Sequence, residues 1–245
     1  MPPRIAIPLP HSGNPDYCKR ALPQYEHAVD MAGGVAVPIP LDPVQAASLI
    51  RTCDAILLPG SNADLDPARF SAPRSPHATP ADPLREAVDD LLLEDAYRSR
   101  KPILCICYGL QSLNVHRCGS LIQHIPDFLP ESTREKVNHE AGRAVPVAHT
   151  VTIEEGSKLA EILSAQKSQL ALPVNSSHHQ SAEKIGEGLR IVARCPDDGI
   201  IEALEGTDPG HFVLAVQWHP ERSVDEDEPS RAIFRALVQA AQAHK

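Results

Sequence analysis

Short apolar runs alternate with helical patterns in the first half of the chain, and this alternation constrains the fold more than any other feature. The runs cover residues 4–9, 35–40, 54–60 and 101–107, bounded by Pro, Gly or Asp. Apolar runs of this length are typical of strands buried on both faces of a parallel sheet. Helices are expected between them, at 22–31, at 43–50 and at 83–97 with Asp82 as N-cap. Such repeated units predict a doubly wound, flavodoxin-like, three-layer α/β fold with a mostly parallel central sheet.

The second half of the chain has a different pattern. Residues 149–157, 189–196, 199–205 and 212–220 alternate like antiparallel strands, and a last helix is expected at 229–243. We therefore expect an additional antiparallel portion in this half. A chain of 245 residues is near the upper limit for one core, so residues 1–245 are expected to form a single domain. The long loop at 61–79 is expected to be functional or mobile.

Composition excludes several classes of protein. Apolar residues make up 42% and charged residues 22%, and no apolar run is long enough to span a bilayer. The N-terminus lacks the features of a signal peptide, and six scattered cysteines favour free thiols, so a cytoplasmic location is expected. A net charge of −9 without a Lys/Arg cluster argues against nucleic acid. A small-molecule partner is expected, without membrane, metal or cofactor, and a homodimer is left open.

The stretch "CICYGLQSL" at 105–113 carries two cysteines with different expected roles. Cys107 ends a predicted strand, at the edge where ligands bind in a doubly wound sheet. A sharp turn from strand to helix needs a small residue two positions later, and Gly109 meets that need. The following helix, expected at 110–118, would favour the Cys107 thiolate through its dipole. Cys107 is therefore the candidate nucleophile, and Cys105 is interpreted as a packing residue.

A thiol nucleophile needs a base, an orienting group and an oxyanion hole. His219 ends an apolar strand in "AVQWHPE", and Glu221 lies two residues beyond it. The carboxylate could hold the imidazole in place for catalysis. Gly60 in "LLPGS" ends a neighbouring strand and lets an amide approach a carbonyl, and the N–H of Tyr108 is the second candidate donor.

In this order and spacing, "LLPGS", "CYGLQ", "VNSSHHQ" and "VQWHPE" resemble the class I glutamine amidotransferase-like superfamily. The resemblance is closest to its peptidase C26 branch, of the gamma-glutamyl-gamma-aminobutyrate hydrolase type. It implies a hydrolase that cleaves a γ-glutamyl amide through a γ-glutamyl thioester, with polyamine catabolism as one setting. It also implies a Cys107–His219–Glu221 triad.

The resemblance extends to the rest of the site. Gly60 with the Ser61 amide and Tyr108 are implied as oxyanion donors, and the implied substrate-binding residues are Gln111, Ser177, His178 and His179. Three positions depart from the pattern of relatives. Ser61 follows Gly60 where many relatives have a second glycine, Cys105 replaces Gly or Ala, and Tyr108 replaces an Arg of some hydrolases.

Three other functions are left open. The first is a glutaminase subunit that delivers ammonia to a separate synthetase, although this chain has no phosphate-binding loop of its own. The second is a metal or redox site on Cys105 and Cys107 with His178 and His179, whose one-residue cysteine spacing fits zinc poorly. The third is a binding protein without turnover. His139 and His149 have no partner that the sequence identifies.

Overall fold

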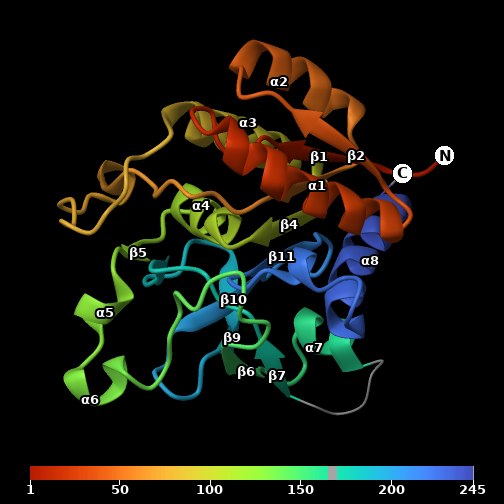
Figure 1. The fold of residues 1–245 in the computed structure, drawn as a ribbon. Coiled ribbons are helices and arrows are strands. Elements are labelled where there is room, and N and C mark those ends of the chain that lie inside the picture. The colour runs from red at the N-terminus through yellow and green to blue at the C-terminus, as the bar shows by residue number, and fades with distance from the viewer. Residues whose placement is uncertain (165–169, 245) are drawn as a thin grey trace.

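A nine-stranded sheet runs through the molecule in the computed structural model, which describes residues 1–164 and 170–244 (Figure 1). The strand order is β2-β1-β3-β4-β11-β10-β9-β6-β7. The strands of this sheet are β1 (Arg4–Pro8), β2 (Val35–Ile39), β3 (Ala55–Leu58), β4 (Ile103–Ile106), β6 (His149–Ile153), β7 (Ala171–Val174), β9 (Leu189–Arg194), β10 (Ile201–Gly206) and β11 (Val213–Val216). A second, two-stranded sheet pairs β5 (Leu121–Ile122) with β8 (Ser181–Ala182).

The two halves of the large sheet differ in strand direction. Strands β2, β1, β3, β4 and β11 pair in parallel, whereas β10, β9, β6 and β7 pair antiparallel. The predicted fold class is therefore confirmed. One expectation is wrong in part: the pattern of residues 212–220 predicts an antiparallel strand, but β11 pairs in parallel with β4 and antiparallel only with β10.

Helices cover both faces of the sheet, as Figure 1 shows. One core cluster joins the sheet to α1 (Pro15–Met31), α7 (Lys158–Ser164) and α8 (Glu228–Ala243). The other joins it to α2 (Pro43–Leu49), α3 (Pro83–Ser99) and α4 (Tyr108–His116). The short helices α5 (Ile125–Phe128) and α6 (Glu131–Arg134) stand away from the sheet.

Local signals explain where the helices begin. The Asp82 side chain accepts a hydrogen bond from the Arg85 N–H and caps α3, as predicted. Helix α1 starts seven residues earlier than expected, because Asn14 caps it and Pro15 occupies its first turn. The predicted 61–79 loop contains a 3₁₀ turn at Pro67–Phe70, and its Asp64 forms an isolated bridge with Ala81, two residues beyond the loop.

Candidate active site

Three neighbouring parallel strands, β3, β4 and β11, end at the same edge of the sheet. Gly60 lies two residues beyond β3, Cys107 directly follows β4, and His219 lies three residues beyond β11. The carboxyl ends of parallel strands form the usual ligand-binding edge of such sheets. The strand order thus brings together residues that are more than a hundred positions apart in the chain.

Cys107 occupies a strained turn between β4 and α4. Its backbone has φ 54° and ψ −107°, a conformation that non-glycine residues rarely adopt. The Cys107 N–H donates to the Val216 carbonyl at 2.8 Å, which ties the turn to β11. Outliers of this kind persist where the surrounding structure holds them, and they cluster at functional sites.

Gly109 makes this turn possible. A Cβ at this position would lie 2.3 Å from the carbonyl oxygen of Leu58 and 2.8 Å from its Cβ. No side chain fits at such distances, so α4 can approach β3 only because residue 109 is glycine. The structure thereby supports the reason for which the sequence singled out this glycine.

His219 and Glu221 form a buried pair. His219 Nδ1 lies 2.7 Å from Glu221 Oε1, and both side chains are almost fully inaccessible. Because the carboxylate accepts the Nδ1 proton, the neutral ring has a bare Nε2, which has no hydrogen-bond partner within the described residues. The Asn175 side chain binds the His219 backbone twice, at 2.9 and 3.0 Å. Glu221 therefore fixes the ring of His219, and Asn175 fixes its backbone.

Gly60 lies close to both the His219 imidazole and the Cys107 side chain. A Cβ built on Gly60 would lie 3.1 Å from His219 Cε1 and 3.7 Å from Cys107 Cβ. The ring and the nucleophile-bearing carbon thus contact the same small residue. A side chain at position 60 would crowd the His219 ring and the Tyr25 hydroxyl.

Burial sets the protonation states of the pair. Burial raises the pKa of Cys107 to about 12, although Arg222 and the Tyr108 N–H act in the opposite direction. Burial therefore outweighs the lowering of the Cys107 pKa that the sequence led us to expect from the N-terminus of the following helix. Burial also lowers the pKa of His219, against the attraction of Glu221. Both shifts favour a neutral thiol beside a neutral imidazole.

The expected oxyanion donors have different surroundings. The Gly60 N–H donates to the Tyr25 hydroxyl at 3.0 Å, so this amide is already engaged. No partner of the Ser61 N–H is found among the described residues, and the Ser61 hydroxyl accepts a bond from the Ala63 N–H. The Tyr108 N–H acts on the Cys107 sulfur. Ser61 and Tyr108 are thus better placed than Gly60 to receive a negatively charged oxygen.

A pocket of about 160 Å³ lies over the nucleophile. All the predicted substrate-binding residues line it, and its lining comprises Ser61, Asn62, Ala63, Asp64, Thr79, Cys107, Tyr108, Gln111, Ser177, His178, His179 and Gln180. Gln111 donates to the Gln180 carbonyl at 3.1 Å, which places its amide beneath the 175–180 segment. A larger cavity of about 320 Å³ shares His178 and His179 but does not contain Cys107.

The three residues of the 177–179 segment have different surroundings. Ser177 accepts a hydrogen bond from Arg222 at 2.8 Å, and His179 Nε2 lies 3.0 Å from an Asp64 oxygen. Both ring nitrogens of His178 point elsewhere, Nδ1 to the Gln180 carbonyl and Nε2 toward Glu202. His178 therefore has no ring nitrogen left for a substrate in this arrangement.

Sequence reasoning missed three residues that support the site: Tyr25, Asn175 and Arg222. Tyr25 bonds Gly60, Asn175 holds the His219 backbone, and Arg222 lies between Glu221 and Ser177. Asn175 stands inside the quoted "VNSSHHQ" stretch and Arg222 directly follows "HPE". The positions of Asn175 and Arg222 in or next to these motifs could have indicated a role in the site. No sequence signal indicated that Tyr25 contacts Gly60.

The metal or redox site considered for Cys105 and Cys107 is not formed. Cys105 is fully buried in the other core cluster, which agrees with its interpretation as a packing residue. In the part of the chain that the structure describes, the groups able to hold a metal include neither of these cysteines nor His179. His178 does belong to such a group, together with His139, His149 and Glu202.

Comparison with known proteins identifies the family of this chain. The Peptidase C26 family profile matches residues 10–221. This chain belongs to the peptidase C26 family. It is 40% identical over 221 residues to a candidate glutamine amidotransferase of Mycobacterium tuberculosis, covering 89% of this chain and 66% of that protein. The chain thus spans slightly less than two thirds of that relative.

Two further proteins are similar to this chain. The gamma-glutamyl-gamma-aminobutyrate hydrolase of Escherichia coli K12 is 33% identical over 227 residues, which are 90% of this chain and 86% of the relative. A candidate GMP synthase component from Thermoplasma acidophilum has a TM-score of 0.66 at 13% identity, covering 99% of this chain and 96% of that one. That likeness shows the fold alone. The family and its relatives make this protein a glutamine amidotransferase-like hydrolase.

No helix in residues 1–164 or 170–244 is both long enough and apolar enough to cross a bilayer.

Proposed function

We propose that this protein hydrolyses the γ-glutamyl amide bond of a small γ-glutamyl compound, releasing glutamate and an amine. The observation that carries the proposal is the arrangement of Cys107, His219 and Glu221. A strained nucleophile turn and a carboxylate-held imidazole meet at one glycine, beside a pocket of about 160 Å³. Gamma-glutamyl-gamma-aminobutyrate appears in the name of the relative from Escherichia coli and is therefore the first substrate to test.

The first step forms a thioester. The Cys107 thiol gives its proton to His219 Nε2 while the sulfur bonds to the γ-carbonyl carbon of the substrate. Because the raised pKa of Cys107 and the lowered pKa of His219 both favour a neutral pair, we expect attack and proton transfer to occur together. The carbonyl oxygen becomes an oxyanion that the Ser61 and Tyr108 amides can stabilise. Collapse breaks the C–N bond, and the amine leaves with the proton from His219.

The second step releases glutamate. A water gives one proton to His219 and its oxygen bonds to the thioester carbon. The C–S bond then breaks, and the proton returns to the sulfur. Glu221 holds the ring in one tautomer and stabilises the imidazolium that forms in both steps. Gln111, Ser177 and His179 line the pocket in which the glutamyl moiety would be held.

The proposal is tested with purified full-length protein and a panel of γ-glutamyl amides, with free glutamine in the same panel. We expect release of glutamate from at least one γ-glutamyl amide, faster than from glutamine. Intact-mass spectrometry after acid quenching should show a γ-glutamyl adduct on Cys107, and hydroxylamine should remove it as a hydroxamate. Turnover without any adduct on Cys107, or no turnover of any member of the panel, would contradict the proposal.

The same panel separates this activity from that of a glutaminase that serves a synthetase. A protein that delivers ammonia to a synthetase would act on glutamine rather than on substituted amides. A preference of the isolated chain for glutamine over all substituted γ-glutamyl amides would therefore replace the hydrolase assignment.

A further inference from the structure

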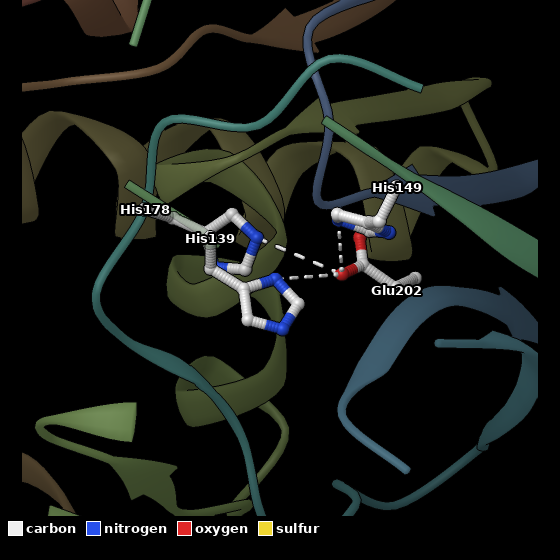
Figure 2. Close-up of side chains that lie close together, drawn as sticks. All are labelled: His139, His149, His178 and Glu202. Atoms are coloured by element: carbon white, nitrogen blue, oxygen red, sulfur yellow. Dashed lines mark ion pairs between the residues drawn. The ribbon is translucent and has the colours of Figure 1, made fainter. Parts of the chain in front are cut away.

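Three histidines surround one carboxylate oxygen in the antiparallel half of the molecule. His139 Nδ1, His149 Nε2 and His178 Nε2 lie 3.3, 3.4 and 3.7 Å from Glu202 Oε1. Figure 2 shows the three rings converging on this oxygen from different segments of the chain. All four side chains are buried, and their ligand atoms lie within 4.8 Å of one another. We call these four residues the histidine cluster.

Hydrogen bonding within the cluster does not explain this arrangement. None of the three inner nitrogens and neither Glu202 oxygen has a hydrogen-bond partner within the described residues. A carboxylate has two oxygens, and a hydrogen-bonded network would distribute three donors over both of them. Here all three nitrogens lie nearest to Oε1, and none of the three contacts meets the geometric criteria of a hydrogen bond. Buried polar atoms without partners are costly, so the cluster needs a further group to satisfy them.

The outer nitrogens fix the protonation of the rings. His149 Nδ1 and His178 Nδ1 face the carbonyl oxygens of Thr150 and Gln180, at 3.4 and 2.9 Å. A carbonyl only accepts, so each of these nitrogens carries the proton. His139 Nε2 lies 2.8 Å from an Asp198 carboxylate oxygen and is a donor for the same reason. With one proton on each outer nitrogen, a ring that carries no second proton presents the lone pair of its inner nitrogen to the carboxylate, an arrangement that a cation would stabilise.

This is the pattern of a metal site with an oriented outer shell. Histidine ligands typically donate their second ring N–H to a carboxylate or a backbone carbonyl, as all three do here. Tetrahedral zinc bonds of about 2.0–2.1 Å place neighbouring ligand atoms about 3.3 Å apart, close to the two shorter distances of the cluster. Glu202 and Asp198 together supply two negative charges, which match a dication.

We propose that the histidine cluster is a zinc site, in which His139, His149, His178 and Glu202 bind one Zn²⁺. Four protein ligands fill a tetrahedron and leave no open position, so the site is structural rather than catalytic. This inference departs from the expectation of a metal-free protein and does not depend on the proposed hydrolase activity. It places His139 Nδ1, rather than its Nε2, on the metal, because a separation of 2.8 Å from Asp198 leaves no room for an ion.

The site would position the wall of the active-site pocket. Its ligands come from the 135–148 connection, β6, the 175–180 segment and β10. His178 stands between Ser177 and His179, and all three line the pocket over Cys107. The ion would thereby hold the 175–180 segment against the sheet. This one expectation rests on the proposed hydrolase activity: loss of zinc should raise its KM more than it lowers kcat.

The test uses the full chain, stripped with a chelator and then titrated with Zn²⁺ against a chromophoric chelator. We expect one tight site per chain, and an absorption spectrum typical of tetrahedral geometry when Co²⁺ replaces Zn²⁺. At a free Zn²⁺ concentration of 100 times its Kd, Tm should rise by roughly 5 to 10 °C. A wild-type chain that binds neither ion stoichiometrically would overturn the proposal and leave a proton as the only occupant of the cluster.

Two variants and a control localise the site. Glu202→Gln keeps the shape but removes the charge, and it should weaken zinc binding by more than about 100-fold, because outer-shell changes alone cost 10- to 100-fold. Asp198→Asn should weaken binding by about 10- to 100-fold through the orientation of His139. The matched control is His77→Gln, in the exposed group of His77, His124 and Asp127. Loss of the tight site in this control with retention in Glu202→Gln would also overturn the proposal.

Discussion

The parallel and antiparallel halves of the sheet hold chemically important residues in different ways. In the parallel half, Gly60, Cys107 and His219 lie beyond the ends of adjacent strands, and each stands in a short recognisable motif. In the antiparallel half, His149 and Glu202 lie within strands, and His139 and His178 come from connections. A site at strand ends is visible in local sequence, whereas a site between sheet and connections is visible only after folding.

The two sites are nevertheless close in the sheet. Strand β11, which precedes His219, lies between β4 and β10, and the Gln217 N–H donates to the Glu202 carbonyl at 2.8 Å. The comparison therefore predicts that the triad and the histidine cluster can be separated by mutation, because they have no side chain in common and only His178 of the cluster also lines the pocket over Cys107. The following changes test that separation, from the largest expected effect to the smallest.

Replacing the nucleophile should give the largest loss. Cys107→Ala is expected to lower kcat/KM for a γ-glutamyl amide by about 10⁵- to 10⁶-fold, because no other group can form the thioester. Zinc stoichiometry should stay unchanged. Cys105→Ala is the matched control, since Cys105 is a fully buried core residue two positions away. Full activity in the first variant together with loss in the second would reverse their assigned roles.

Changing the orienting carboxylate should cost less. Glu221→Gln is expected to lower kcat by about 10³- to 10⁴-fold, because the amide no longer stabilises the imidazolium or fixes its tautomer. Steady-state kinetics on the same substrate measure the effect. Glu226→Gln, in the exposed loop that follows, is the control and should retain activity. Equal rates for both variants would remove Glu221 from the mechanism.

Replacing Gly109 in the turn that carries Cys107 should lower the stability of the protein. Gly109→Ala places a Cβ 2.3 Å from the Leu58 carbonyl oxygen, so α4 must move and the free energy of unfolding should fall by about 3 kcal/mol. Urea denaturation followed by circular dichroism measures the change. In Gly13→Ala the nearest atom lies 3.6 Å away, so this control should change stability by less than about 0.5 kcal/mol. Indistinguishable midpoints for the two variants would contradict the close approach of α4 and β3.

Thiol reactivity should follow the pKa of Cys107. Since burial raises this pKa to about 12, the thiolate fraction is small at neutral pH and grows with pH. The rate of Cys107 labelling by iodoacetamide, followed by peptide mass spectrometry, should rise about tenfold per pH unit from pH 7 to 9. The labelling rate of a cysteine in a short unstructured peptide, with an ordinary pKa of about 8.5, should begin to level off in that range. A labelling rate that is already constant below pH 7 would show a thiolate in the free protein.

The elements of the parallel half could be predicted from the sequence in detail, because the signals for them are local. A few adjacent residues are enough to predict each of three features: the strands that end near a glycine, the Asp82 cap of α3 and the turn at Cys107. The same reasoning overestimated the helix effect on Cys107, because burial is a property of the folded core and cannot be read from a motif.

The antiparallel half was less predictable for a related reason. Strand β7 and helix α7 were not predicted, and His139 and His149 had no identifiable partner, since their partner Glu202 lies more than fifty residues away. The direction of β11 also depends on which neighbour is considered, and the sequence indicates only its antiparallel pairing with β10. The four cluster residues have no regular spacing that would mark them as a set.

The left-handed backbone of Cys107 has a consequence for how this protein can change over generations. Glycine adopts φ 54° without strain, so Cys107→Gly should relax the turn at the same time as it removes the sulfur. Selection for thermal robustness and selection for turnover therefore act in opposite directions at this position. In a descendant that is no longer under selection for catalysis, this cysteine would be expected to be replaced early.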